Sequence, residues 1–180
     1  MGEGNDLATE LATDEGGFGL TSRTLGGLPI VNHVLDRLGL PALLDEALGE
    51  VDGRSTLTPA AAIRLVITNL VLGREPLYAL GEWAARFDPA LLAMAESEVA
   101  AVNDDRVGRA LDVLSGADQA HLLTAVMLRA ISEFSVSTSQ LHNDSASISV
   151  HGAYRSADGT VRRGKATPVI THGHSKDHRP

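Results

Sequence analysis

The strongest constraint on the fold is a run of apolar residues between Ala60 and Leu72. Its large side chains recur with the period of an α-helix, at Ile63, Val66, Ile67, Leu70 and Val71. Thr58 and Pro59 precede the run, in the order typical of a helix N-cap and first turn. Aromatic residues make up only 3% of the chain, so we expect a core of closely packed small helices rather than of aromatic-rich strands.

The same spacing predicts further helices on both sides of this run. In the range 28–38, Pro29 suits a first helical turn and Gly39 suits the end of the helix. The other helical ranges are 41–48, 77–87, 89–95, 103–114 and 118–134. We therefore expect a flexible leader over residues 1–24, which hold few apolar anchors, and a helical domain over residues 25–138.

The pattern changes after Ser135, where serine and β-branched residues replace alanine and leucine. Ile148 and Val150 alternate with serines, which is the period of a β-strand. Asp158-Gly159 is typical of a hairpin turn. Residues 144–172 are thus predicted to form two strands joined by a flexible, basic loop that contains Arg162-Arg163-Gly164-Lys165. The predicted fold class is mainly α, with a helical domain followed by the first strands of a sheet.

Charge is divided unevenly along the chain. The net charge is −8, but residues 1–150 hold nine Arg and no Lys against twenty-one acidic residues, whereas residues 151–180 hold six basic residues against two acidic ones. Five of the seven histidines lie in the last forty positions, at His142, His151, His172, His174 and His178. We place a domain boundary near residue 140 and expect phosphate contacts in the basic part, because the acidic part repels a phosphate backbone.

Membrane-spanning and disulfide-bonded secreted proteins are excluded by what the sequence lacks. No window approaches the ~20 apolar residues of a membrane span, and the start Met1-Gly2-Glu3-Gly4 lacks the basic residues and apolar run of a signal peptide. The chain has no cysteine, so it has neither disulfides nor thiolate metal sites. We expect a soluble, cytoplasmic protein.

Five blocks of the sequence, in order along the chain, share one resemblance: Leu28-Pro29-Ile30-Val31-Asn32-His33, Gly73-Arg74-Glu75-Pro76-Leu77-Tyr78-Ala79-Leu80, Asn103-Asp104-Asp105-Arg106-Val107-Gly108-Arg109-Ala110-Leu111-Asp112, Leu141-His142-Asn143-Asp144-Ser145 and Gly173-His174-Ser175-Lys176-Asp177-His178-Arg179-Pro180. Together they resemble the N-terminal part of bacterial insertion-sequence transposases of the insertion-sequence-four-like superfamily. The resemblance spans residues 25–180. In that family the leading helical region is catalogued only as a domain of unknown function.

The resemblance implies a ribonuclease-H-like catalytic domain, which here would begin at residue 139 and be truncated. Such domains carry an Asp-Asp-Glu triad whose first Asp lies on the first strand, and Asp144 occupies that place. Two-metal phosphoryl transfer needs several carboxylates that hold Mg²⁺ or Mn²⁺ about 3.5–4 Å apart. The second Asp and the Glu would lie after Pro180, so we expect a truncated transposase that is inactive by itself.

The resemblance also makes the terminal inverted repeats of an insertion element the expected DNA partner, with self-association as another expected contact. The candidate phosphate contacts are Arg162, Arg163, Lys165, His174, Lys176 and Arg179. A solvated hairpin accounts equally well for the basic stretch, which consists of Arg155, Arg162, Arg163, Lys165, Lys176 and Arg179. In the helical domain, Arg64, Arg74 and Arg86 near the turn between Gly73 and Pro76 could belong to a helix-turn-helix-like unit, although the acidity of this region counts against it.

Several of these residues also have a structural interpretation. Asp144 taken by itself is typical of a strand edge or turn cap, and Asn103-Asp104-Asp105-Arg106 of a helix cap with an ion pair. The segment His172–His178 is similar to the zinc motif of metallo-β-lactamase-like hydrolases, but one extra residue separates its elements, which favours a polar loop. Trp83 and Tyr78 are more typical of a core than of a nucleobase stacking platform.

Two other functions stay open. The chain could be a stand-alone module that binds DNA ends or the intact transposase and thereby represses transposition. It could also be a helical protein-interaction domain without a DNA role, whose sign would be a stable oligomer of residues 25–135 that ignores DNA.

Overall fold

A computed structural model of the chain describes residues 22–49, 55–140, 153–155, 157–162 and 164–170. The chain divides into two compact units, Met1–Ser139 and Gln140–Pro180, and each is treated by itself below. Among the residues that the structure describes, no helix has the length and apolar character needed to cross a membrane.

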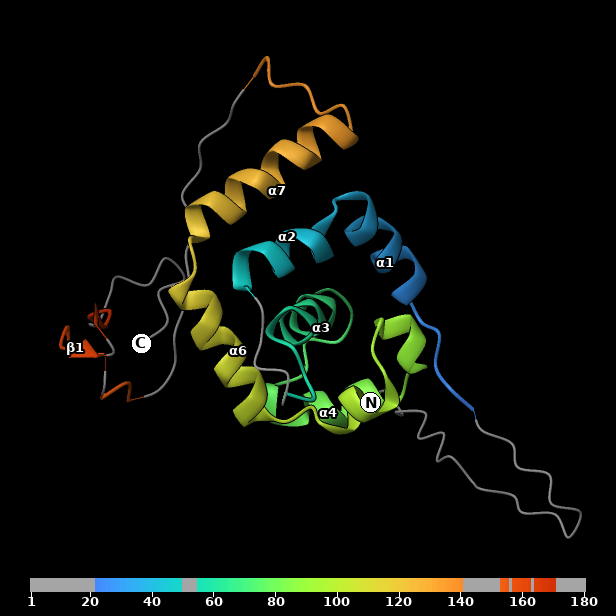
Figure 1. Cartoon of the computed structure of the whole chain (residues 1–180), viewed down its shortest axis with the longest axis horizontal. Coiled ribbons are helices and arrows are strands. Elements are labelled where there is room, and N and C mark those ends of the chain that lie inside the picture. Colours follow the sequence, from blue (N-terminus) through green and yellow to red (C-terminus); the bar gives the residue numbers. More distant parts are fainter. Residues whose placement is uncertain (1–21, 50–54, 141–152, 156, 163, 171–180) are drawn as a thin grey trace, which may run out of the picture. The chain divides into compact units, whose positions relative to one another are not determined.

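The first unit is built from helices (Figure 1). The α-helices are α1 (Leu28–Arg37), α2 (Leu40–Leu48), α3 (Pro59–Leu72), α4 (Leu80–Ala85), α5 (Glu96–Ala100), α6 (Asp104–Gly116) and α7 (Gln119–Glu133). Two short 3₁₀ helices accompany them, η1 (Leu77–Ala79) and η2 (Pro89–Leu92). The prediction of a mainly helical chain is confirmed for the part that the structure describes.

Helix α3 is the centre of this unit. Figure 1 views it almost along its axis, with α1, α2, α4 and α6 packed around it. The N-cap predicted at Thr58 is confirmed, because its side chain accepts a hydrogen bond from the backbone N–H of Ala61 at 3.1 Å. Ala62, Ile63 and Leu65 are buried, whereas Leu70 and Val71 are 60% and 62% exposed. The first part of the apolar run therefore faces the core and its last turn does not.

Small aliphatic side chains make most of the core. The largest fully buried side chains belong to Leu28, Leu44, Leu65, Leu80 and Val107. Complete burial of one such side chain contributes about 1.5–3 kcal/mol to folding. The aromatic part consists of Trp83 and Phe87, whose rings meet edge to face with centroids 4.9 Å apart.

The short helices depart from the prediction. The range 77–87 is divided into η1 and α4, and the range 89–95 contains only η2. Helix η2 begins where Asp88 Oδ1 accepts from the backbone N–H of Ala90 at 2.9 Å, and it ends at Ala93, whose φ of 52° is left-handed. Helix α5 was not predicted. Five residues are too few to show a helical period.

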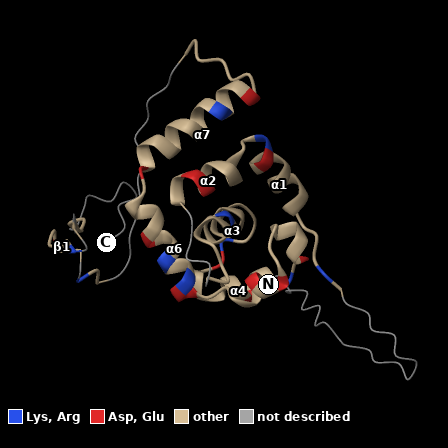
Figure 2. Cartoon of the chain, viewed as in Figure 1, with Lys and Arg blue, Asp and Glu red and all other residues tan. Residues whose placement is uncertain are grey.

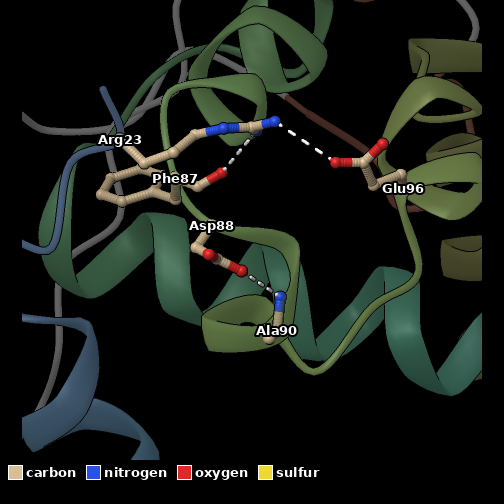
Figure 3. A network of polar contacts seen from close by, with 5 residues as sticks. All are labelled: Arg23, Phe87, Asp88, Ala90 and Glu96. Carbon is tan, nitrogen blue, oxygen red and sulfur yellow. Dashed lines mark hydrogen bonds and ion pairs between the residues drawn. The ribbon is translucent and has the colours of Figure 1, made fainter. Parts of the chain in front are cut away.

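Residues that the sequence assigned to the leader contact this unit. Arg23 donates from Nη1 to the main-chain oxygen of Phe87 at 3.1 Å and from Nη2 to Glu96 Oε1 at 3.3 Å (Figure 3). The backbone N–H of Thr24 donates to Arg86 O at 2.8 Å. The described chain is therefore attached to the helices from Arg23 onward, two residues before the expected start of the helical domain.

The second unit contains a small antiparallel hairpin. Strand β1 (Val161–Arg162) pairs with strand β2 (Lys165–Ala166), and the bridge between Asp158 and Val169 keeps the same register. The chain therefore reverses between Arg162 and Lys165, not at Asp158-Gly159. The basic segment is the hairpin itself rather than a loop between two strands. The strand predicted around Asp144 lies outside the described residues, so the ribonuclease-H-like part stays a prediction.

Candidate nucleic-acid interface

The tip of the hairpin brings two basic positions together. Arg162 and Lys165 are directly paired across the two strands, and Arg162 is exposed. Like charges at directly opposed positions destabilise a strand pair, and a bound anion relieves that repulsion. Gly164 beside them has a φ of 78°, a conformation that glycine adopts without strain and that allows the tight reversal. The hairpin tip thus places two basic residues at opposed backbone positions on either side of a tight turn.

A carboxylate holds the hairpin below its tip. Asp158 Oδ1 accepts hydrogen bonds from the Thr160 hydroxyl at 2.6 Å, from the Thr160 backbone N–H at 3.1 Å and from the Thr167 hydroxyl at 3.4 Å. These bonds, above all the one from the Thr160 hydroxyl, lower the pKa of Asp158 below its ordinary value. Asp158 therefore has a structural role in this hairpin through its Oδ1 atom.

Most of the predicted site residues fall outside the described part of the chain. Arg162 and Lys165 are described as above, with Lys165 placed by its backbone pairing alone. The others are Asp144, Arg163, His174, Lys176 and Arg179. The zinc-like segment His172–His178 lies outside it too. Among the described residues, no group of three or more His, Asp or Glu side chains could hold a metal ion. The assignments to DNA and metal binding stay predictions.

Arg64 does not have the exposed place that a DNA-reading unit would need. Its side chain is 14% exposed, and its Nη2 lies 3.7 Å from Asp36 Oδ1 and donates to Asn32 Oδ1 at 3.1 Å. Asn32 in turn donates from Nδ2 to the main-chain oxygen of Leu91. This network joins α1, α3 and η2, so Arg64 belongs to the framework of the unit. Of the three arginines considered for a helix-turn-helix-like unit, Arg64 is therefore not available to contact DNA.

The turn after α3 is fixed by a buried amide that the sequence analysis did not single out. Asn69 is 2% exposed, and its side chain donates to Glu75 O at 2.8 Å and accepts from Glu75 N–H at 3.0 Å. A Cβ atom at Gly73 would lie 2.6 Å from Trp83 Nε1, so only glycine fits. Arg74 has a φ of 58°, which is uncommon for a residue other than glycine. The sequence feature that could have identified Asn69 is the presence of a polar residue within an apolar helical run.

Tyr78 and Trp83 have different environments, and the expectation that both belong to the core is wrong for one of them. Trp83 is 4% exposed and packs in the core, as predicted, whereas Tyr78 is 81% exposed. The difference arises because Tyr78 lies in η1, which buries none of its residues, and Trp83 lies one helix later. Arg74 and Tyr78 are thus both exposed.

The block at the start of α6 is a helix cap, as predicted. Asn103 Oδ1 accepts from the backbone N–H of Arg106 at 2.9 Å, and Asp104 Oδ1 accepts from the backbone N–H of Asp105 at 3.0 Å. Where an ion pair was expected, the guanidinium of Arg106 donates to the main-chain oxygen of Ala101 at 2.9 Å. These side chains stabilise the join between α5 and α6.

The surface of the helical unit mixes the two signs of charge. In Figure 2 acidic and basic segments are interspersed along the helices, and no labelled helix is basic over its length. A pocket of about 250 Å³ between α2 and α7 includes Glu46, Asp118 and His121 in its lining. Two carboxylates make this pocket unfavourable for a phosphate. The basic feature of the described chain is therefore the hairpin.

The fold and these polar contacts define a small α-helical domain followed in sequence by a basic hairpin. A family model described as a domain of unknown function (DUF4277) matches residues 20–128. The match covers more than half of the chain, so the chain belongs to this family. No curated protein and no solved structure matches the chain.

Proposed function

We propose that the chain is the N-terminal part of a bacterial insertion-sequence transposase with Asp-Asp-Glu chemistry. The observation that carries this proposal is the order of the five blocks that resemble such transposases, three of which lie within the family match over residues 20–128. The expected overall activity of full-length relatives is cleavage of DNA ends and strand transfer, and the expected DNA is the terminal inverted repeats.

The helical blocks contribute to this proposal through the fold. Asn32 connects α1 to Leu91 and Arg64, Gly73 allows the close approach of Trp83, and Asn103 caps α6. Each block thus contains a residue that a neighbouring element needs. The resemblance of these blocks is a resemblance of architecture, and it supports a shared domain rather than a catalytic site in the helices.

The DNA role is supported by the hairpin. Arg162 and Lys165 are paired at its tip and Asp158 holds its base, which gives a cationic feature on a defined backbone. Phosphate contacts of this kind position a protein on DNA and carry no sequence information themselves. We propose that the hairpin contacts the backbone of the element end near the scissile phosphate.

Asp144 is the proposed first carboxylate of the catalytic site. In a two-metal site it would be one of several ligands for Mg²⁺ or Mn²⁺, which would activate the attacking oxygen and stabilise the leaving one. The resemblance places the second Asp and the Glu of such a site far downstream of Asp144, outside these 180 residues, so we expect these residues alone to bind DNA without cleaving it.

The test is a binding and cleavage assay on duplexes that carry the element's inverted repeats, with scrambled duplexes of equal length as the control. We expect specific, salt-sensitive retention and no nicking with Mg²⁺ or Mn²⁺. Equal binding to both duplexes, or none, would contradict the DNA-end proposal. Nicking that Asp144→Ala abolishes would contradict the proposed lack of activity.

A second candidate is a stand-alone regulatory module that occupies DNA ends or binds the intact transposase. It is supported by the helical unit's own buried core, which does not depend on the hairpin. The two candidates differ in a transposition assay with intact enzyme in which the 180-residue chain is added in excess. Repression in proportion to the added chain would favour the regulatory module, and an unchanged transposition rate would contradict it.

A further inference from the structure

The outer face of α7 is apolar and exposed. Only Leu122 is buried among the residues of this helix, and α2 is the main element that α7 packs against in the part of the chain that the structure describes. Figure 1 shows α7 lying along the outside of α2. Leu123, Met127 and Leu128 are 64%, 62% and 62% exposed. Solvated leucine and methionine in such a row are typical of an interaction surface.

The side of α7 opposite the buried Leu122 forms one continuous face, which is apolar except for Thr124. At 100° per residue its residues cover an arc of about 140° without a charged side chain. Its members are Ala120, Leu123, Thr124, Met127, Leu128, Ile131 and Phe134. Arg129 and Glu133 project from the other side of the helix on this geometry, and Glu133 Oε1 accepts from Arg37 Nε at 2.7 Å. The two charges thus leave the apolar face uninterrupted.

The face continues onto α1 through the end of α7. The Arg37 guanidinium lies over the Phe134 ring, 4.5 Å from its centroid. Val34 and Ile30 precede Arg37 on α1 by one and two helical turns, on the same stripe, and both are exposed. We use the name α7 face for the six α7 residues given above together with the C-cap residue Phe134 and with Ile30 and Val34 of α1.

We infer that the α7 face pairs with the same face of a second copy of this chain, with the two α7 helices antiparallel and Met127 on the two-fold axis. An interface of this symmetry uses one surface twice, so the surface must complement itself. In this register Ala120 lies level with Phe134 of the other copy, so that a small side chain meets a large one. No charge faces a like charge within the arc. This inference is independent of the proposed DNA function.

The size of the face agrees with a pair of chains. Helix α7 is about 22 Å long, at 1.5 Å per residue. The large exposed apolar residues of the face are Ile30, Val34, Leu123, Met127, Leu128 and Phe134. At roughly 100 Å² each they offer about 600 Å² per chain, or about 1,200 Å² for two chains, which is the lower end of the range for a specific interface. Nucleic acid is a poor occupant, because it requires several cations, whereas the arc of α7 carries none and the nearby Arg37 is paired with Glu133.

The absence of cysteine allows a direct test on the full chain. Met127→Cys is expected to form an intermolecular disulfide under mild oxidation, because the two copies of residue 127 meet on the axis within disulfide reach. Ser132→Cys, exposed on the same helix but outside the arc, is the matched control and is expected to remain reduced. A mixture of Ala120→Cys and Phe134→Cys chains is expected to give the mixed disulfide in preference to either symmetric one.

Sedimentation provides the second measurement. The wild-type chain is expected to sediment as a dimer at about 100 µM, and Met127→Arg as a monomer with an unchanged far-ultraviolet circular dichroism spectrum, whereas Ser132→Arg remains dimeric. The inference is overturned if the wild-type chain is monomeric at this concentration, or if Ser132→Arg dissociates it equally. Symmetric disulfides at residue 120 without the mixed product would overturn the antiparallel arrangement.

Discussion

At the scale of single residues, buried hydrogen-bonding groups determine more of this fold than charged pairs do. Asn69 is buried and joins α3 to the following turn through both atoms of its amide. The ion pair between Arg23 and Glu96 is largely exposed at the carboxylate, and exposed pairs contribute about 0–1 kcal/mol. Loss of the Asn69 side chain should therefore lower the free energy of unfolding more than loss of the Arg23–Glu96 ion pair does.

Asn69→Ala is expected to lower the free energy of unfolding by about 2–3 kcal/mol, because it leaves the N–H and C=O of Glu75 without their partner. Urea denaturation of the full chain measures this. Asn103→Ala, which removes a helix cap at an exposed position, is the comparison and should cost about 1 kcal/mol. Equal effects of the two substitutions would show that the turn does not depend on the buried amide.

The stability of the hairpin is expected to depend on pH, because Asp158 holds it in its ionised form. Its pKa in the folded chain is lowered, chiefly by the Thr160 hydroxyl, so the carboxylate stabilises the hairpin above its ordinary pKa of 3.8. This contribution is lost as the pH falls through the lowered value. The Thr160 amide resonance in NMR spectra should shift over that acidic range. In Asp158→Asn the same resonance should not shift with pH. A shift that persisted in this variant would show that a group other than Asp158 causes it.

At the scale of elements, the long helices could be predicted from the sequence and the short ones could not. Helices α3, α6 and α7 each combine a helical period with a capping side chain, at Thr58, Asn103 and Asp118 respectively. Helices η1, η2 and α5 are set by tertiary contacts and by single left-handed residues, which leave little periodicity. Tyr78 was misplaced for this reason, since the sequence does not show how η1 turns away from the core.

The hairpin shows the same limit. The sequence indicated strand-like residues and a turn, but the dipeptide Asp158-Gly159 is not where the strands reverse. Asp158 instead uses its carboxylate to hold Thr160, which a sequence pattern does not distinguish from a turn cap. The basic candidates Arg162 and Lys165 were identified by charge alone, and their pairing across the strands could be recognised only from the register.

Arg162→Ala is expected to weaken binding to inverted-repeat DNA and to reduce the slope of log K against log salt by about 0.9, the value for one phosphate contact. Titration of the duplex at several salt concentrations measures both quantities. Arg23→Ala removes the same charge from the helical unit and should leave the slope unchanged. If both variants changed the slope equally, total charge rather than the hairpin would explain the binding.

At the scale of the whole molecule, the division into two units predicts independent unfolding. A chain ending after Ser139 retains the helices that the structure describes and the buried core. Its thermal midpoint, followed by circular dichroism, should agree with that of the full chain within about 2 °C, because the helical unit keeps its own contacts. A decrease of about 10 °C would show that the second unit stabilises the helices.

The place of Trp83 gives the helical unit an optical signature of its own. It is the single tryptophan of the chain and lies in the helical core, edge to face with Phe87 and beside the turn at Gly73. The second unit contains Tyr154 and no tryptophan. Tryptophan emission excited near the red edge of its absorption will therefore follow the helical unit alone, without any attached dye, while events in the hairpin leave it unchanged.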